Sequence, residues 1–288
     1  MNSYVIFTDS ACDIKQEILA EWGIRNIELS FRFEGEDKEY LNSDMDISEF
    51  YSRMKEGGIA KTAAINPDTF EKEFESVLSQ GSDVLYLAFS SGLSTTCNSA
   101  KIAAEELSSK YPERTILVVD TLSASAGQGM LVYLASAKQK QGASVAECAE
   151  YLDEIKGSIC HWFTVDDLVY LKRGGRVSPA VALIGKALGI KPVMHVDDEG
   201  KLVKMGTARG RHASITALCD KYTELAKTKE SGLVYISHAD CLSDAQKLAN
   251  MIEEKHGVKT EIITDVGTVI GAHAGPGTLA LFFVGTNR

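Results

Sequence analysis

Small hydroxyl side chains surround a single glycine between residues 88 and 100, where the chain reads Ala-Phe-Ser-Ser-Gly-Leu-Ser-Thr-Thr-Cys-Asn-Ser-Ala. The apolar run Val84–Leu87 before it predicts a buried strand, and a helix is predicted after it. Where a strand passes into a helix, hydroxyl groups and the free N–H groups of the first helical turn point the same way. The stretch therefore predicts a cradle for an anion or carboxylate, with an ordinary helix cap as the alternative.

Other residues that could bind a ligand lie after the remaining predicted strands. Asp9, Ser10 and Asp13 follow the predicted first strand, at the edge where open α/β sheets place ligands. His273 has glycines on both sides, which allow the backbone to approach a ligand closely. Thr62 is an isolated hydroxyl just before a predicted helix. Taken singly, each of these residues also fits a role in a cap or a turn.

Several common site motifs are absent from the sequence. There is no G-x-x-x-x-G-K-[ST] and no G-x-G-x-x-G after a strand, so neither a nucleotide site nor a cofactor is predicted. Six cysteines and six histidines show no metal-ligand spacing, so no metal site is predicted. The hydrolase elbow Gly-x-Ser-x-Gly is also absent. Ser94 and His273 nevertheless supply a nucleophile and a base, which leaves an acyl hydrolase or transferase open.

Length and composition predict a soluble protein of two domains. The chain has 288 residues, of which 44% are hydrophobic and 24% charged, an ordinary globular balance. A net charge of −10 makes it a poor candidate for non-specific binding of nucleic acid. No apolar run approaches the roughly 20 residues of a membrane span, and no signal-peptide pattern is present. Scattered cysteines without C-x-x-C indicate reduced thiols and a cytoplasmic location.

The elements that must position these residues alternate between short apolar strands and longer helices. Through residue 157, repeated strand–loop–helix units predict an N-terminal three-layer α/β/α domain with a mainly parallel sheet. Ile27–Phe33 is predicted to form one strand of this part. From residue 158, a hairpin around an Asp-Asp-Glu-Gly turn is combined with crossover connections. We therefore expect a C-terminal two-layer α/β domain with a mixed sheet, and domains of residues 1–157 and 158–288.

Together these motifs resemble the DegV family, the fatty-acid-binding FakB-type partners of bacterial fatty acid kinase. The resemblance covers essentially the whole chain, and its two glycine-rich blocks are long enough to be specific. In chain order, the motifs are Thr8-Asp9-Ser10-x-x-Asp13, Ser90-Ser91-x-Leu93-Ser94-x-Thr96, Asp167-Leu168-x-Tyr170-Leu171-Lys172-Arg173-Gly174-Gly175-Arg176-Val177-Ser178, Lys191-Pro192 and Gly271-x-His273-x-Gly275-Pro276-Gly277.

The resemblance implies a non-catalytic protein that holds one long-chain fatty acid. The acyl chain would lie in an apolar tunnel, and the carboxylate would be held by hydroxyls and a histidine, which fall on Thr62, Ser94 and His273. The protein would present the bound carboxyl group to a separate ATP-dependent kinase, which makes the acyl phosphate for phospholipid metabolism. Acyl chain length, unsaturation and the identity of the kinase do not follow from these motifs.

Four further residues are candidates for contact with the head group or with the partner. They are Ser91, Thr95, Arg173 and Arg209. The chain departs from the family pattern at Ala63, where the family often has serine, and at Thr95, where added bulk could alter the head-group loop. A binder of a small ketone, like the substrate subunit of dihydroxyacetone kinase, is a second alternative because the DegV fold resembles that subunit.

A basic patch stands out in this acidic chain. It consists of Lys172, Arg173 and Arg176. The patch could join the two domains through carboxylates, or it could dock the kinase. Arginine often forms interface pairs, so we expect a structural role for at least one of these arginines.

Overall fold

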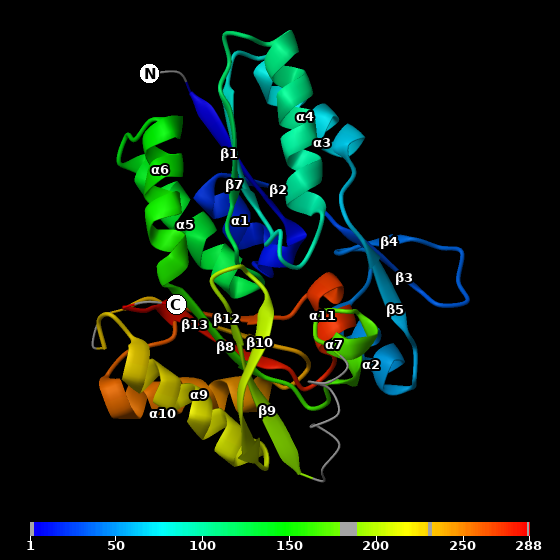
Figure 1. Ribbon diagram of the computed structural model, residues 1–288, viewed down its shortest axis with the longest axis vertical. Coiled ribbons are helices and arrows are strands. Elements are labelled where there is room, and N and C mark those ends of the chain that lie inside the picture. The colour runs from blue at the N-terminus through cyan, green and yellow to red at the C-terminus, as the bar shows by residue number, and fades with distance from the viewer. Residues whose placement is uncertain (1–2, 179–188, 230–231, 287) are drawn as a thin grey trace.

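The computed structural model describes residues 3–178, 189–229, 232–286 and 288, and it contains three β-sheets (Figure 1). The first is a parallel sheet with the strand order β2-β1-β6-β7. Its two central strands, β1 and β6, are mainly apolar and buried because both faces are covered by helices. The strands are β1 (Tyr4–Asp9), β2 (Ile24–Ile27), β6 (Asp83–Ala88) and β7 (Ile116–Asp120).

Helices cover both faces of this parallel sheet, so the predicted three-layer arrangement is confirmed. Successive strand residues point to opposite faces. Ile6 accordingly packs with Met130 in one cluster, whereas Phe7 packs with Phe74 in another. The first face carries α1 (Gln16–Trp22), α5 (Ala126–Lys140) and α6 (Val145–Ile155), and the second carries α3 (Pro67–Leu78) and α4 (Thr96–Lys110).

The second sheet is mixed and has the strand order β10-β9-β8-β13-β11-β12, as predicted for the C-terminal part. Helices α9 (Arg211–Leu225) and α10 (Leu242–His256) cover one face, where Trp162 and Leu281 pack with Leu218 and Leu248. The opposite face packs toward α5. The strands are β8 (Ile159–Thr164), β9 (Ile190–Val196), β10 (Leu202–Arg209), β11 (Val234–His238), β12 (Ile262–Asp265) and β13 (Leu279–Val284).

A third, small sheet corrects the prediction of one strand over Ile27–Phe33. The chain pairs with β1 as far as Ile27 and then crosses into a separate antiparallel sheet. There Phe31 and Phe33 pack with Phe50 and Ala272, which attaches the small sheet to the C-terminal part of the chain. The elements of this region are β3 (Ser30–Phe33), β4 (Tyr40–Leu41), β5 (Ala60–Ala63), α2 (Ile47–Lys55), α7 (Val169–Arg173) and α11 (Thr268–Ala274).

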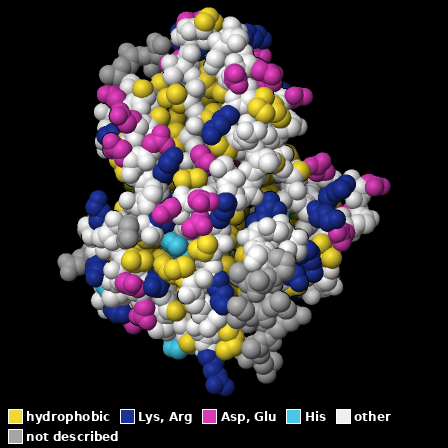
Figure 2. Space-filling view, viewed as in Figure 1, with side chains coloured by type: hydrophobic (Ala, Val, Ile, Leu, Met, Phe, Trp, Pro, Cys, Tyr) yellow, Lys and Arg dark blue, Asp and Glu magenta, His cyan; other side chains and the backbone are white. Residues whose placement is uncertain are grey.

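The chain passes from the first part to the second at a short 3-10 helix, η2 (Lys156–Ser158), between α6 and β8. We retain the division into residues 1–157 and 158–288 as a proposal. Within the described ranges, none of the helices is both long enough and apolar enough to cross a membrane. In Figure 2, acidic and basic side chains are interspersed over the visible face of the molecule.

Candidate ligand-binding cavity

A mainly apolar cavity of about 490 Å³ lies between the parallel sheet, the small sheet and the mixed sheet. Its size falls in the range typical of small-molecule sites, which are apolar with a few placed polar groups. One face of the mixed sheet supplies Phe163, Ala280 and Phe282, and α11 supplies Val269 and Ile270. The polar side chains that line the cavity are Thr62, Ser91, Ser94, Thr95, Ser125, His161, Arg176, Ser237, His273 and Thr278.

Two of the predicted head-group residues meet directly, although they are far apart in the sequence. The Thr62 hydroxyl oxygen lies 2.8 Å from Nε2 of His273. Thr62 is held in register by the antiparallel pairing of β5 with β3, where it lies opposite Phe31. His273 lies in the last turn of α11. The pairing within the small sheet therefore places Thr62 next to His273. No local pattern in the sequence indicates this contact.

His273 is uncharged near neutral pH because it is largely buried. Burial lowers its pKa from 6.5 to about 4, and the nearby positive charge of Arg176 acts in the same direction. Its Nδ1 atom has no hydrogen-bond partner among the described residues and lies against Gly174. A proton on Nδ1 would have no acceptor and stay unsatisfied, so we assign the proton to Nε2. Nε2–H then donates to Thr62, and the Thr62 hydroxyl proton is free to donate to a ligand.

Ser94 lies in the loop that leads into α4. Its hydroxyl oxygen accepts a hydrogen bond from the Thr96 amide at 3.2 Å and lies 2.9 Å from the Thr96 hydroxyl. The Ser90 hydroxyl fixes the start of the same loop by donating to the main-chain oxygen of Gly200 at 2.8 Å. At Gly92 a β-carbon would come within 2.6 Å of the Glu199 main-chain oxygen, so this close approach requires glycine. The hydroxyl-rich loop is thus packed on the turn between β9 and β10.

The arrangement gives no support to a Ser94–His273 hydrolase. In the described part of the chain, Ser94 bonds with Thr96 while His273 bonds with Thr62. A hydrolase requires the base to contact the nucleophile and a third group to orient the base, and Nδ1 of His273 has no such partner. Among the same residues, no group of three His, Cys, Asp or Glu side chains is placed to hold a metal ion.

Arg176 lines the cavity and was not among the predicted site residues, although it belongs to the basic patch. Its Nε and Nη2 atoms donate to the main-chain oxygen of Leu93 at 3.1 and 2.9 Å. Arg176 therefore connects the segment after Gly174-Gly175 to the loop that carries Ser94. The expected role in joining the two parts is present, but the acceptor is a peptide carbonyl and not a carboxylate.

The other predicted residues divide into two pairs. Ser91 and Thr95 line the cavity, and both side chains are also exposed to solvent. Arg173 and Arg209 are exposed and do not line the cavity, and Arg173 packs over the Tyr170 ring at 5.7 Å. A contact of either arginine with a partner protein stays a prediction.

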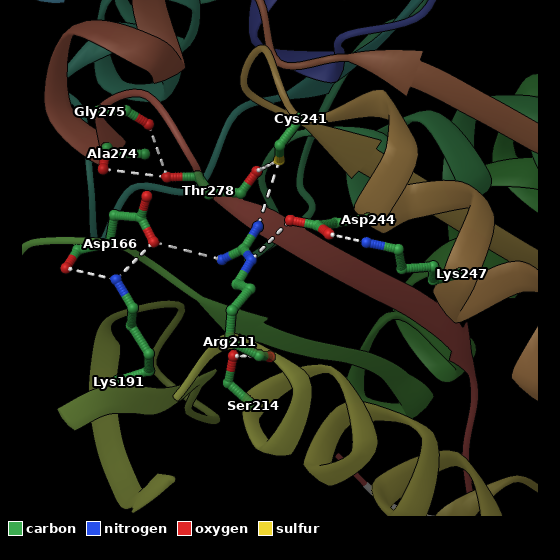
Figure 3. A network of polar contacts seen from close by, with 10 residues as sticks. All are labelled: Asp166, Lys191, Arg211, Ser214, Cys241, Asp244, Lys247, Ala274, Gly275 and Thr278. Carbon is green, nitrogen blue, oxygen red and sulfur yellow. Dashed lines mark hydrogen bonds and ion pairs between the residues drawn. The ribbon is translucent and has the colours of Figure 1, made fainter. Parts of the chain in front are cut away.

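An ionic network beside the cavity supports the end of α11 (Figure 3). Nε of Arg211 donates to Asp244 at 2.8 Å, and its Nη1 atom lies 3.6 Å from Asp166. Lys191 donates to Asp166 at 2.7 Å. Nη2 of Arg211 also lies 3.3 Å from the sulfur of Cys241. Arg211, at the start of α9, thus anchors several segments that surround the turn after His273.

That turn is held by Thr278, which forms part of the same network (Figure 3). The Thr278 hydroxyl lies 3.0 Å from the main-chain oxygen of Ala274, the last residue of α11. A β-carbon at Gly275 would meet the Tyr170 ring at 2.3 Å, and one at Gly277 would meet the Asp166 carboxylate at 2.3 Å. The glycines of the Gly-x-His-x-Gly-Pro-Gly block therefore permit close packing behind the histidine.

A second polar group lines the cavity away from Thr62 and His273. The Ser125 hydroxyl bonds with Oδ2 of Asp13 at 2.5 Å and with the Ser237 hydroxyl at 2.9 Å. Asp13 is buried, and burial raises its pKa from 3.8 to about 7. The Gly267 amide donates to Oδ1 of Asp13 at 3.0 Å. The sequence had singled out Asp13, but nothing local to it indicates that Ser237 would lie opposite Ser125.

Comparison with known proteins gives matches along the whole chain. Residues 3–286 match a family described as "Uncharacterised protein, DegV family". A DegV domain-containing protein of Clostridium perfringens is 41% identical over 289 residues, covering 100% of this chain and 99% of that protein. A structure described as fatty acid binding of a DegV family protein from Thermus thermophilus shows 28% identity and a TM-score of 0.88 over 99% and 100% of the two chains. A DegV lipid binding protein from Thermotoga maritima shows 29% identity and a TM-score of 0.87 over 99% of both chains.

Proposed function

Because this chain belongs to the DegV family, we propose that it binds one long-chain fatty acid in the cavity, with the carboxylate at Thr62, Ser94 and His273. The observation that carries the proposal is the Thr62–His273 hydrogen bond at 2.8 Å on the wall of a mainly apolar cavity. The Thermus thermophilus structure, described as fatty acid binding, supports the same ligand class.

The physical chemistry of the cavity fits a fatty acid. A carboxylate that leaves water requires strong hydrogen bonds, which the hydroxyls of Thr62 and Ser94 can supply. Each methylene that enters the apolar part contributes about 0.8 kcal/mol. A neutral His273 can orient Thr62 without placing a buried charge in the unloaded protein. Tight binding would therefore need no catalytic group.

We further propose that the protein presents the bound carboxyl group to a separate ATP-dependent fatty acid kinase. The support is that Ser91 and Thr95 both line the cavity and are exposed, so the head-group loop lies at the protein surface. A partner that covers this loop could reach the carboxyl group while the acyl chain stays buried. The kinase, and not this chain, would then form the acyl phosphate.

Native mass spectrometry of the purified protein, followed by denaturing extraction and lipid identification, tests the binding proposal. We expect one fatty acid per chain, and we expect Thr62→Val and His273→Gln to lower affinity by about tenfold or more. A matched control is half-buried and lies outside the cavity, where the Thr223 hydroxyl is 2.9 Å from Nε2 of His256. Thr223→Val should therefore leave fatty acid affinity unchanged.

Two outcomes would contradict the binding proposal. A delipidated protein that takes up no added fatty acid would overturn it, and a covalent dihydroxyacetone adduct on His273 would favour the small-ketone alternative. Kinase presentation needs its own assay, in which a bacterial fatty acid kinase and ATP are added to the loaded protein. Acyl phosphate formed only when both proteins are present would support it, whereas hydrolysis of an activated acyl ester by this chain alone would favour the hydrolase.

A further inference from the structure

Ser125 and Ser237 form a polar pair in a mainly apolar part of the cavity wall. Ser237 is fully buried and Ser125 is 5% exposed, yet both line the cavity. Ser237 lies on β11 opposite Ala280, which in turn lies opposite Phe163 on β8. Ser237, Ala280 and Phe163 thus lie side by side on the sheet face that lines the cavity, and Ser237 is the polar residue of these three.

This pair is separated from the proposed carboxylate site by the length of α11. Asp13, which bonds with Ser125, also accepts a hydrogen bond from the amide of Gly267 at the start of that helix. His273 lies six residues later, which corresponds to a rise of roughly 9 Å along a helix. A fatty acid whose carboxylate lies at His273 would therefore pass the serine pair with a carbon well along its chain.

The Ser237 hydroxyl, which lines the cavity, has either its proton or its lone pairs free after it bonds with Ser125. Each hydroxyl has one proton and two acceptor lone pairs. If Ser125 donates to the Asp13 carboxylate, Ser237 donates to Ser125 and keeps free lone pairs. If Asp13 is protonated and donates to Ser125, then Ser125 donates to Ser237, whose own proton is free. An alcohol on the ligand can meet either arrangement because it both donates and accepts, whereas a methylene can meet neither.

The backbone at Asp13 and at Ser125 is in an unfavourable conformation. Asp13 and Ser125 both have φ of 52°, a region that residues other than glycine rarely adopt. Such conformations persist where the surrounding structure holds them, and they cluster at ligand sites. The Asp13–Ser125 contact joins two such residues, which fixes the Ser125 hydroxyl beside Ser237.

His161 is the other polar side chain in this part of the wall, and it serves a different purpose. Its Nδ1 atom lies 2.9 Å from the Ile159 main-chain oxygen, to which it donates. Nε2 lies against Gly127, where a β-carbon would come within 2.3 Å of it, and it has no hydrogen-bond partner among the described residues. With Nδ1 as the donor, Nε2 of His161 can only accept a hydrogen bond, whereas the Ser237 hydroxyl can donate or accept.

We propose that Ser237, positioned by Ser125 and Asp13, recognises a hydroxyl group on the acyl chain, so that the cavity prefers hydroxylated fatty acids with the hydroxyl at one region of the chain. This inference rests on the proposed fatty acid binding and adds a specificity-determining contact to it. The class of ligand is a long-chain monohydroxy fatty acid bound through two polar points, the carboxylate and the alcohol.

The test is a set of equilibrium affinities of the delipidated, full-length protein. The probes are octadecanoic acid and a series of monohydroxyoctadecanoic acids that differ only in the position of the hydroxyl. We expect one position, or a few adjacent ones, to bind about tenfold more tightly than the other isomers. Ser237→Ala should remove this preference and leave the affinity for octadecanoic acid unchanged. Thr62→Val should weaken all probes by a similar factor and keep the preference.

A flat profile in the wild-type protein, with octadecanoic acid still bound, would overturn the inference and leave the proposed function intact. A preference that persists in Ser237→Ala would also overturn it, because the contact would then lie elsewhere. Failure of every probe to bind would instead contradict the proposed function itself. The wild-type profile is decisive even if the Ser237→Ala protein does not fold.

Discussion

Nδ1 of His273 packs so closely on Gly174 that a β-carbon on this glycine would come within 2.1 Å of the nitrogen. Gly174 has φ of −73°, a conformation open to any residue. The glycine is therefore required by the space that the imidazole occupies and not by its backbone geometry. The presence of glycine at position 174 is thus explained by His273, which lies 99 positions further along the chain.

Gly174→Ala should displace His273 from Thr62 without unfolding the protein. The added methyl group overpacks the site, which commonly costs about 1–3 kcal/mol. We expect fatty acid affinity to fall by about tenfold or more, measured by equilibrium binding to the delipidated protein. Gly157→Ala is the control, because a β-carbon at Gly157 meets no atom within 4 Å. Equal affinities of the two variants would contradict the packing argument.

Arg176→Met should destabilise the fold, because it removes two charged hydrogen bonds to the Leu93 main-chain oxygen and leaves that carbonyl without them. A hydrogen bond to a charged group contributes roughly 1.5–3 kcal/mol, so we expect a loss of about 2 kcal/mol in chemical denaturation. Arg173→Met, at an exposed position three residues earlier, should change the free energy of unfolding by less than about 0.5 kcal/mol. A similar loss in both variants would show that the basic patch acts through its net charge.

Asp13→Asn should change how stability depends on pH. The pKa of Asp13 is about 7 in the folded protein against a usual 3.8, so the folded state binds the proton more tightly than the unfolded state. The wild-type protein should therefore gain stability relative to Asp13→Asn as the pH falls from about 7 to 3.8, with a limiting slope of about 1.4 kcal/mol per pH unit. Urea denaturation of both proteins across this window checks the sign. A difference that stays constant would contradict a raised pKa.

The protonation of His273 should respond to the ligand. In the unloaded protein its pKa is lowered to about 4, mainly by burial, so its imidazole should stay neutral at pH 6. A bound carboxylate favours the charged form, so loading with fatty acid should raise this pKa. Titration of the imidazole nitrogens by NMR in the delipidated and the loaded protein measures both values. Unchanged titration on loading would place the carboxylate elsewhere in the cavity.

The sequence by itself determined the type of most elements and the family. Continuous apolar runs such as Val84–Leu87 predict buried strands because both faces of the parallel sheet are covered. The turn between β9 and β10 could be predicted because Asp-Asp-Glu-Gly consists of residue types that favour tight turns. Thr62, Ser94 and His273 were selected through the family resemblance and all line one cavity. These signals depend on residues close together in the chain.

Only the tertiary structure decided which of these residues touch. The strand predicted over Ile27–Phe33 divides because Phe31 and Phe33 are buried against α2 and α11, and this crossing brings β5, with Thr62, to His273. Ser125 and Ser237 meet for the same kind of reason, across 112 positions of sequence. Local sequence patterns determine burial, caps and turns. Contacts between residues far apart in the sequence depend on how sheets and helices pack together, and no single segment predicts that packing.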